Sequence, residues 1–271
     1  MRALENSEQV SETRYPPIMD GPPVTVVNPG GTSPFILMCD HASNALPADY
    51  WRLGLPEAVF DEHVAYDPGA RDVTLRLADQ LDATAVLANY SRLLIDPNRP
   101  PDHESLVPPT SDSIEIPGNL SIDQQEISRR VEAFHQPYHD ALTQHIIAMT
   151  ARGQIPVMIG VHSFTPIMQG AGRPWQVGIL WNRDPRAAEP LIAWLRRDPS
   201  LTVGDNQPYS GRILGHSMNE HGGRIGLANA VIELRQDLID TPDRAFDWAD
   251  ILADALRHVA AAPGLFEVRH Y

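Results

Sequence analysis

The sequence predicts an α/β fold, in which helices pack against a largely parallel sheet. Short apolar runs bounded by turn residues, such as 35–38 and 155–161, indicate buried strands. A strand expected at 84–90 follows an amphipathic helical segment, which is the pattern of a βαβ unit. With 271 residues, of which 42% are hydrophobic, the chain is long enough to build one large core.

The first half of the chain is expected to begin with a polar arm. Residues 1–22 are polar and end in proline-rich turns, so we expect a flexible N-terminal arm followed by one domain over 23–271. The elements expected next are strands at 24–27 and 35–38, short helices at 47–62, and an amphipathic helix after Asp67-Pro68. Asp67 is in a position to cap that helix, with Pro68 in its first turn.

The second half alternates between strands and helices around two long loops. A short apolar strand is expected at 93–95, and loops at 102–118 and 205–211. The remaining elements are a helix from a Ser121 cap to Arg152 with a bend at Pro137, strands at 155–161, 176–181 and 229–232, and helices at 186–197 and 243–261.

Composition excludes several classes of function. The net charge is -14 and the pI is about 5.1, so we expect no nucleic-acid partner, because phosphate contacts need clustered Lys and Arg. The single cysteine, Cys39, excludes a disulfide framework and a Cys-rich zinc site, and it is expected to be a buried apolar residue. Neither a membrane span of ~18 apolar residues nor a signal peptide is apparent, so a cytoplasmic protein is expected, with its oligomeric state left open.

Two histidines are expected at the ends of buried strands. The run 35–38 leads into Cys39-Asp-His-Ala-Ser-Asn44, and the run 155–161 leads into His162-Ser-Phe-Thr165. In an open α/β sheet, ligand sites lie beyond the carboxyl ends of the strands. His41 and His162 are therefore candidate metal ligands or catalytic bases that converge on one point. The alternative is that each histidine is only hydrogen bonded within a loop.

Charged residues near other strand ends complete a candidate site. Glu233 ends the last apolar strand, where an acid needs partners, so it is a candidate general base or forms an ion pair with Arg235 or another arginine. Arg92 and Arg99 suggest an anionic substrate, because guanidinium groups bind carboxylates with two hydrogen bonds. The alternative for Arg92 is a surface ion pair with Asp96.

Three further histidines lie along the helix expected from 121 to 152. His135 and His139 have the i, i+4 spacing of a metal pair, but no acid completes the H-E-x-x-H pattern. We therefore expect His135, His139 and His145 to be packing or surface residues.

Five segments in order resemble the N-formylglutamate amidohydrolase family: Cys39–Asn44, His63–Ala70, Tyr90–Pro100, Gly160–Phe164 and Val231–Asp237. The resemblance implies a phosphorylase/hydrolase-like fold akin to zinc carboxypeptidases, with a three-layer mixed, mostly parallel sheet and helices on both faces. It also implies metal-dependent hydrolysis of the amide bond of a small anionic N-acyl amino acid, such as N-formylglutamate. One zinc ion is the expected cofactor, with another divalent metal as the alternative.

The resemblance also assigns roles to individual residues. His41 and His162 match metal ligands, but Asn44 stands where carboxypeptidases have a glutamate ligand. Asp67 is the preferred third ligand, with Glu62 and Asn44 as alternatives. Asn98 and Arg99 resemble a pair that holds a substrate carboxylate, Arg92 and His221 are further candidates for substrate binding, and Glu233 resembles the carboxylate that activates water.

Two other functions compete with the zinc hydrolase. A metal-free hydrolase would use Ser163 or Ser43 as its nucleophile, although neither lies in a Gly-x-Ser-x-Gly elbow. A protein that binds acidic metabolites without turnover would keep the same scaffold. Metal dependence separates the first alternative from the zinc hydrolase, and turnover separates the second.

Overall fold

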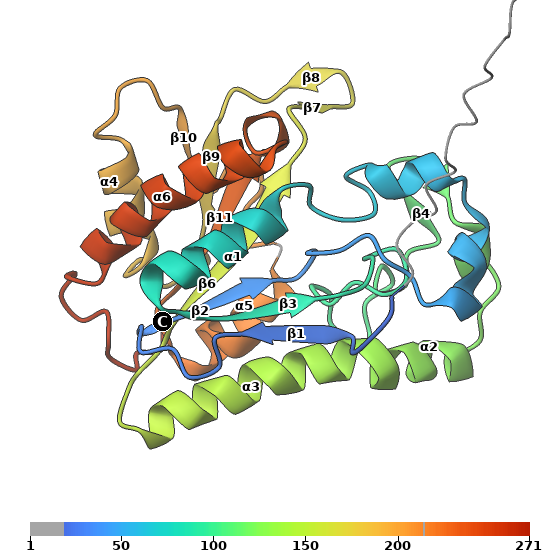
Figure 1. Cartoon of the computed structure of the whole chain (residues 1–271), viewed down its shortest axis with the longest axis horizontal. Coiled ribbons are helices and arrows are strands. Elements are labelled where there is room, and N and C mark those ends of the chain that lie inside the picture. Colours follow the sequence, from blue (N-terminus) through green and yellow to red (C-terminus); the bar gives the residue numbers. More distant parts are fainter. Residues whose placement is uncertain (1–18, 214) are drawn as a thin grey trace, which may run out of the picture.

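The computed structural model describes residues 19–213 and 215–271, which are organised around a seven-stranded sheet (Figure 1). The strand order is β1-β3-β2-β6-β11-β9-β10. The strands are β1 Val24–Val27, β2 Phe35–Cys39, β3 Thr84–Ala88, β6 Val157–Phe164, β9 Val177–Leu180, β10 Val203–Asp205 and β11 Asn229–Arg235. The β1–β3 and β9–β11 pairs are antiparallel and the other four pairs are parallel, which confirms the mixed, mostly parallel sheet.

The central strands are apolar because both faces of the sheet are covered. In β2, Phe35, Leu37 and Cys39 belong to the core on one face, whereas Ile36 and Met38 belong to the core on the other. All five residues are buried. Strands buried on both faces appear as continuous apolar runs rather than as an alternating pattern, which explains why this strand was visible in the sequence.

Helices cover the two faces of the sheet in separate layers (Figure 1). One layer contains α1 Ala70–Leu81, α4 Ala188–Leu195 and α6 Pro242–Val259, whose buried residues join one core. The other layer contains α2 Gln124–Arg130, α3 Gln136–Ala151 and the short α5 His216–His221. Tyr138, Leu142 and Met218 pack into the second core from this side. The predicted three-layer architecture is confirmed.

Smaller elements form the segments between strands and helices. Residues 47–62, expected to be helical, contain the 3₁₀ segments η1 Ala48–Gly54 and η2 Glu57–Asp61. The loop expected at 102–118 contains a hairpin, and a second hairpin follows β6. The remaining elements are β4 Thr110–Ser111, β5 Ile114–Glu115, β7 Ile167–Met168, β8 Ala171–Gly172, η3 Pro117–Asn119, η5 Gly223–Ile225 and η6 Gln236–Leu238.

Several local predictions were wrong. Residues 93–95 form no strand, because Leu93 and Leu94 lie in a turn in which the backbone N–H of Leu94 donates to the Ser91 carbonyl at 3.0 Å. Asp123 replaces Ser121 as the cap of α2, and its carboxylate accepts a hydrogen bond from the N–H of Glu126 at 2.9 Å. The short strand β10 was not predicted, because its three residues lie next to a segment that has the composition of a loop.

The long helix expected from 121 to 152 is interrupted by a π-helical segment rather than bent at Pro137. The segment η4 covers Val131–His135, and α3 begins directly after it. Pro137 lies in the first turn of α3, which continues η4 without a break, so its missing N–H leaves a gap in the helical hydrogen bonds beside the π-helical segment. Single π-helical turns are frequent at functional sites.

Residues 1–18 of the predicted arm lie outside the described residues, and Met19 donates its backbone N–H to the Leu46 carbonyl at 3.0 Å. Among the helices that the structure describes, none has both the length and the apolar character needed to cross a bilayer.

Candidate functional site

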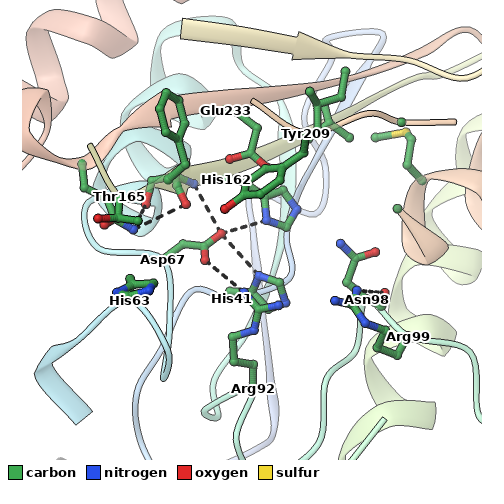
Figure 2. Close-up of a pocket in the computed structure, with 18 of the residues that line it drawn as sticks. His41, His63, Asp67, Arg92, Asn98, Arg99, His162, Thr165, Tyr209 and Glu233 are labelled. Atoms are coloured by element: carbon green, nitrogen blue, oxygen red, sulfur yellow. Dashed lines mark hydrogen bonds and ion pairs between the residues drawn. The ribbon is translucent and has the colours of Figure 1, made fainter. Parts of the chain in front are cut away.

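Two histidines and one aspartate converge at the carboxyl edge of the sheet. His41 is the second residue after β2, His162 lies within β6, and Asp67 lies in the turn before α1. Nδ1 of His41 is 3.3 Å and Nδ1 of His162 is 2.8 Å from the same oxygen, Oδ2 of Asp67. All three side chains are buried, and one ligand atom from each lies within 4.8 Å of the others. Figure 2 shows Asp67 between the two imidazole rings.

The turn before α1 directs Asp67 toward the histidines. The backbone N–H of Asp67 donates to the His41 carbonyl at 3.0 Å, which ties the turn to the end of β2. Gly69 has a φ of 79°, in the left-handed region, and a Cβ there would collide with the Ile239 carbonyl oxygen. The expected capping role is taken by Gly69, which is the residue before α1. The Asp67 carboxylate is therefore available to the site.

The other two candidates for a third ligand lie elsewhere. The side-chain amide of Asn44 donates to the Phe60 carbonyl at 2.7 Å, and Asn44 does not line the cavity that contains the histidines. Glu62 is exposed on the surface. Of the three residues considered from the sequence, only Asp67 meets His41 and His162.

A second carboxylate lies behind each histidine. Nε2 of His41 is 2.8 Å from Oδ1 of Asp96, and Nε2 of His162 is 3.1 Å from Oδ2 of Asp40. The Tyr138 hydroxyl donates to the other oxygen of Asp40 at 2.7 Å. Metal-binding histidines usually donate their second ring N–H to a carboxylate in this way, which fixes the ring and leaves Nδ1 for the metal.

The sequence interpretation gave Asp40 and Asp96 no role in the site. Asp40 stands directly before His41, and Asp96 was considered only as a surface partner of Arg92. The sequence pattern nevertheless indicated both residues, because each acid directly follows a buried apolar run. A histidine pair that binds metal also requires two such partners.

The charges of this cluster stabilise each other despite their burial. Burial disfavours the imidazolium of His162, but hydrogen bonds to Asp40 and Asp67 outweigh it and raise its pKa well above the usual value. Burial equally disfavours the carboxylate of Asp67, but His41 and His162 outweigh it and lower its pKa. The site thus favours positive charge at the point between the three side chains. Two imidazole nitrogens and a carboxylate around such a point form a donor set that suits zinc.

Glu233 lies beside His162 in the sheet. The two residues are neighbours in the register of β11 and β6. Glu233 is buried, and its Oε2 has no hydrogen-bond partner among the described residues. Burial is the main cause that raises the pKa of Glu233 to about 7, and the charge of Asp67 adds to it. A buried carboxyl group with an unused oxygen and a pKa near neutrality is suited to proton transfer.

These residues line one cavity of about 390 Å³ (Figure 2). One wall carries the cluster and Glu233, and Asn98 and Arg99 lie beside each other on the opposite side of the imidazole rings. Apolar side chains fill much of the remaining lining, including Val64, Phe164, Met168, Leu180, Trp181, Met218 and Val231. The cavity therefore combines charged groups with apolar side chains, as small-molecule sites commonly do.

Asp96 connects the arginines to the histidine cluster. Its Oδ2 is 3.0 Å from Nη2 of Arg92, and Nη1 of Arg92 is 3.6 Å from Asp67. The predicted alternative for Arg92, an ion pair with Asp96, is thus present, but Asp96 is buried and Arg92 lines the cavity instead of the outer surface. The backbone N–H of Asn98 donates to Oδ1 of Asp96 at 2.9 Å. One aspartate thereby positions His41, Arg92 and the Asn98 loop.

The side chains of Asn98 and Arg99 are fixed by neighbouring groups. Oδ1 of Asn98 accepts a hydrogen bond from the Ser217 backbone at 3.2 Å. Nε of Arg99 donates to the Ser105 hydroxyl at 3.1 Å, and Nη1 donates to the Asn98 carbonyl at 2.9 Å. Both side chains are only half-buried and both line the cavity. Both are therefore held in place at the cavity wall.

Three other candidates from the sequence are not arranged for their suggested roles. His221 does not line the cavity, because its Nε2 lies 2.7 Å from Nδ1 of His139. The hydroxyl of Ser163 donates to the Pro68 carbonyl at 2.8 Å, and that of Ser43 accepts from the Ala45 N–H at 3.1 Å. In the described structure, neither serine is hydrogen bonded to a histidine that could act as its base.

Comparisons with known proteins identify the family of the chain and its structural neighbours. A family model described as N-formylglutamate amidohydrolase matches residues 33–240. The crystal structure of a gene product from Agrobacterium tumefaciens is 36% identical in sequence, covers 89% of this chain and 96% of its own, and superposes with a TM-score of 0.86. The crystal structure of N-formylglutamate amidohydrolase from Ralstonia eutropha is 21% identical in sequence and covers 87% of this chain and 98% of its own. It superposes with a TM-score of 0.60, which shows a likeness of fold. No curated protein matches the chain.

Proposed function

The chain belongs to the N-formylglutamate amidohydrolase family, and from this premise we propose that it is a metal-dependent enzyme that hydrolyses the amide bond of N-acyl amino acids. N-formylglutamate is the first candidate substrate, by analogy with the family. The observation that carries the proposal is the convergence of His41 and His162 on Asp67, next to the unpartnered Oε2 of Glu233.

Three residues would hold the metal. His41 and His162 would bind it through Nδ1 and Asp67 through its carboxylate, a set that leaves a position open, as catalytic zinc sites do. Zinc bound there would polarise the amide carbonyl and lower the pKa of a water molecule toward about 7. Asp96 and Asp40 hold the two rings through Nε2, so that their Nδ1 atoms stay directed at Asp67.

Glu233 moves the proton in the proposed reaction. Its carboxylate takes a proton from the attacking water while the water oxygen bonds to the acyl carbon. The same group then delivers the proton to the amide nitrogen as the C–N bond breaks. The products are the free amino acid and the acid derived from the acyl group. A pKa of about 7 allows Glu233 to accept and release the proton near neutral pH.

Asn98 and Arg99 orient the substrate in this proposal. The Arg99 guanidinium and the amide of Asn98 would bind the substrate carboxylate from the side opposite Asp67. Arg92 lies between Asp96 and Asp67, so it would assist orientation near the reacting bond. Fixing the carboxylate at one end of the cavity places the acyl amide near Glu233 and the histidines.

A substrate panel tests the proposal directly. The purified chain is incubated with N-formyl-, N-acetyl- and N-succinyl-glutamate, and the released acid and amine are measured separately. We expect hydrolysis that disappears after chelation and returns with added zinc. Hydrolysis by a chain shown to be free of metal would exclude the metal requirement. Binding of these compounds without turnover in the presence of zinc would instead identify a binding protein.

A further inference from the structure

A second group of histidines lies against the loop that carries Asn98 and Arg99. His135 ends the π-helical segment η4, His139 lies one helical turn later in α3, and His216 begins α5. One ring nitrogen from each lies within 4.8 Å of the other two. His135 and His139 are buried, and His216 is half-buried. The group lies outside the lining of the cavity described above.

Backbone carbonyls fix the orientation of the two buried rings. Nε2 of His135 lies 2.9 Å from the Arg99 carbonyl, and Nε2 of His139 lies 3.0 Å from the Pro97 carbonyl. A carbonyl oxygen can only accept, so each Nε2 carries the proton and each Nδ1 carries a lone pair. Histidines that bind metal show this arrangement, in which the second nitrogen donates to a carbonyl or carboxylate.

A fourth imidazole adjoins the group. Nε2 of His221 lies 2.7 Å from Nδ1 of His139, and the two rings are stacked with centroids 5.0 Å apart. Because Nδ1 of His139 carries a lone pair, Nε2 of His221 must be the donor in this contact. Burial, together with neighbouring histidines, lowers the pKa of His139 to about 3. Burial also lowers that of His221 to about 4. The contacts with the two carbonyl groups leave a lone pair on Nδ1 of His135 and on Nδ1 of His139.

We propose that His135, His139 and His216 form a second binding site for a divalent cation of the zinc type, with His221 next to it as a further nitrogen donor. Imidazole nitrogen is a preferred ligand of zinc, and three histidines suffice for a zinc site. The cation takes the place of the proton between His139 and His221, and that proton moves to Nδ1 of His221. The number of protons on the protein is unchanged by this shift.

The second site acts on the loop that binds substrate in the proposed function. Two of its three ligands already hold the backbone of Pro97 and Arg99, and the Ser217 hydroxyl next to His216 donates to the Pro97 carbonyl at 3.2 Å. A bound cation joins η4, α3 and α5 at one point and so fixes this loop between them. Its role is structural, and its detection does not depend on turnover.

Zinc stoichiometry tests the second site separately from the first. The full chain and its variants are dialysed against a zinc buffer, and the bound zinc is measured by mass spectrometry. We expect two ions per chain in the wild type, one in Asp67→Asn, one in His216→Ala, and two in His145→Ala. His145 is the matched control, because it lies on α3 outside the group.

The outcomes distinguish the two proposals. A wild type with one ion, lost in Asp67→Asn and retained in His216→Ala, would overturn the second site and leave the first intact. One ion that is lost only in His216→Ala would overturn the first site and support the second. Retention of two ions by His216→Ala would also exclude the second site.

A second measurement leaves the histidine group unsubstituted, so it remains valid even if the His216→Ala variant misfolds. Zinc is added to the Asp67→Asn chain while the histidine ring resonances are followed by NMR. We expect the resonances of His135, His139 and His216 to shift together at one equivalent, while that of His145 stays in place. Unchanged resonances of the first three rings would show that the group is only a hydrogen-bonded support for the loop.

Discussion

Glu233 and His162 are direct neighbours in the register of the parallel strands β11 and β6. Residues paired in this way project from the same face of a sheet. Val231 and Met158, two and four residues earlier in these strands, belong to the core on the side of α3. The sheet itself therefore places the carboxyl group beside the imidazole, on a rigid element instead of a loop.

Replacement of this carboxyl group tests its proposed role as the base. Glu233→Gln keeps the size of the side chain but cannot accept a proton. We expect turnover to fall by about 10²- to 10⁴-fold, the usual contribution of a positioned general base, while bound metal stays unchanged. Initial rates and metal analysis on the same samples provide the measurement. Glu62→Gln, at an exposed position, is the control and should behave as wild type. Turnover of Glu233→Gln within a few fold of wild type would exclude Glu233 as the base.

The pH dependence of kcat/KM follows from the raised pKa of Glu233. The base must be unprotonated to accept a proton, and its pKa is about 7. Activity should therefore rise with pH below about 7 and level off above it, because protonation of the free enzyme removes the base. A profile of kcat/KM against pH across this range checks the expectation, and the residual activity of Glu233→Gln should not show the same rise. If the variant still shows this rise, a group other than Glu233 is responsible for it.

Asp96 is expected to control metal affinity without being a ligand. Its carboxylate holds Nε2 of His41 and also pairs with Arg92. Asp96→Asn removes the charge from both contacts, so zinc affinity should fall by roughly 10- to 100-fold, as is usual for partners of metal ligands. Competition with a chelator of known affinity measures the change. Asp205→Asn, an exposed acid at the end of β10, is the control. Equal affinities in the two variants would remove Asp96 from the site.

The histidines and Glu233 could be located from the sequence because each follows or ends a long apolar run. Such runs fix both the strand and the edge at which it ends. Asp67 was harder to place, since the segment Asp67-Pro68 before a helix has the pattern of a cap. Its actual direction depends on the left-handed Gly69 and on contacts with Ile239, which lies far away in the sequence.

The wrong prediction for residues 93–95 has a different cause. The apolar run 93–95 is buried, but it is buried in a turn, where its side chains pack against the core and its backbone is bonded locally. Apolar composition reports burial and does not by itself report backbone conformation. The histidine group at α3 was interpreted as packing, because its third member, His216, belongs to a helix about eighty residues later in the chain. Spacing within one helix contains no information about that contact.

Arg99 provides a test of substrate orientation. Arg99→Lys keeps the positive charge but loses the planar group that donates two parallel hydrogen bonds. Loss of one hydrogen bond to a charged group costs about 1.5–3 kcal/mol, so KM should rise by roughly 10- to 100-fold. Steady-state kinetics on the best substrate of the panel give KM and kcat separately. Arg244→Lys, which is exposed on α6, should leave both constants unchanged. An unchanged KM in Arg99→Lys would place the carboxylate elsewhere.

Gly69 links the stability of the fold to the position of Asp67. Gly69→Ala combines left-handed strain with a collision between the new Cβ and the Ile239 carbonyl oxygen. Gly153 has nearly the same φ, 78° against 79°, and a Cβ there meets no atom within 4 Å. Gly153→Ala should therefore lose only the strain, about 1–2 kcal/mol of unfolding free energy. Gly69→Ala should lose clearly more, because backbone atoms must move to accept the Cβ.

Denaturant unfolding of both alanine variants in the presence of a chelator measures this difference without any metal contribution. Zinc affinity then gives the second comparison. Because the shifted turn carries Asp67, Gly69→Ala should bind zinc more weakly than Gly153→Ala, even where both chains are fully folded. Equal zinc affinities would mean that the turn tolerates the new side chain without moving Asp67, and the link between Gly69 and the site would then be disproved.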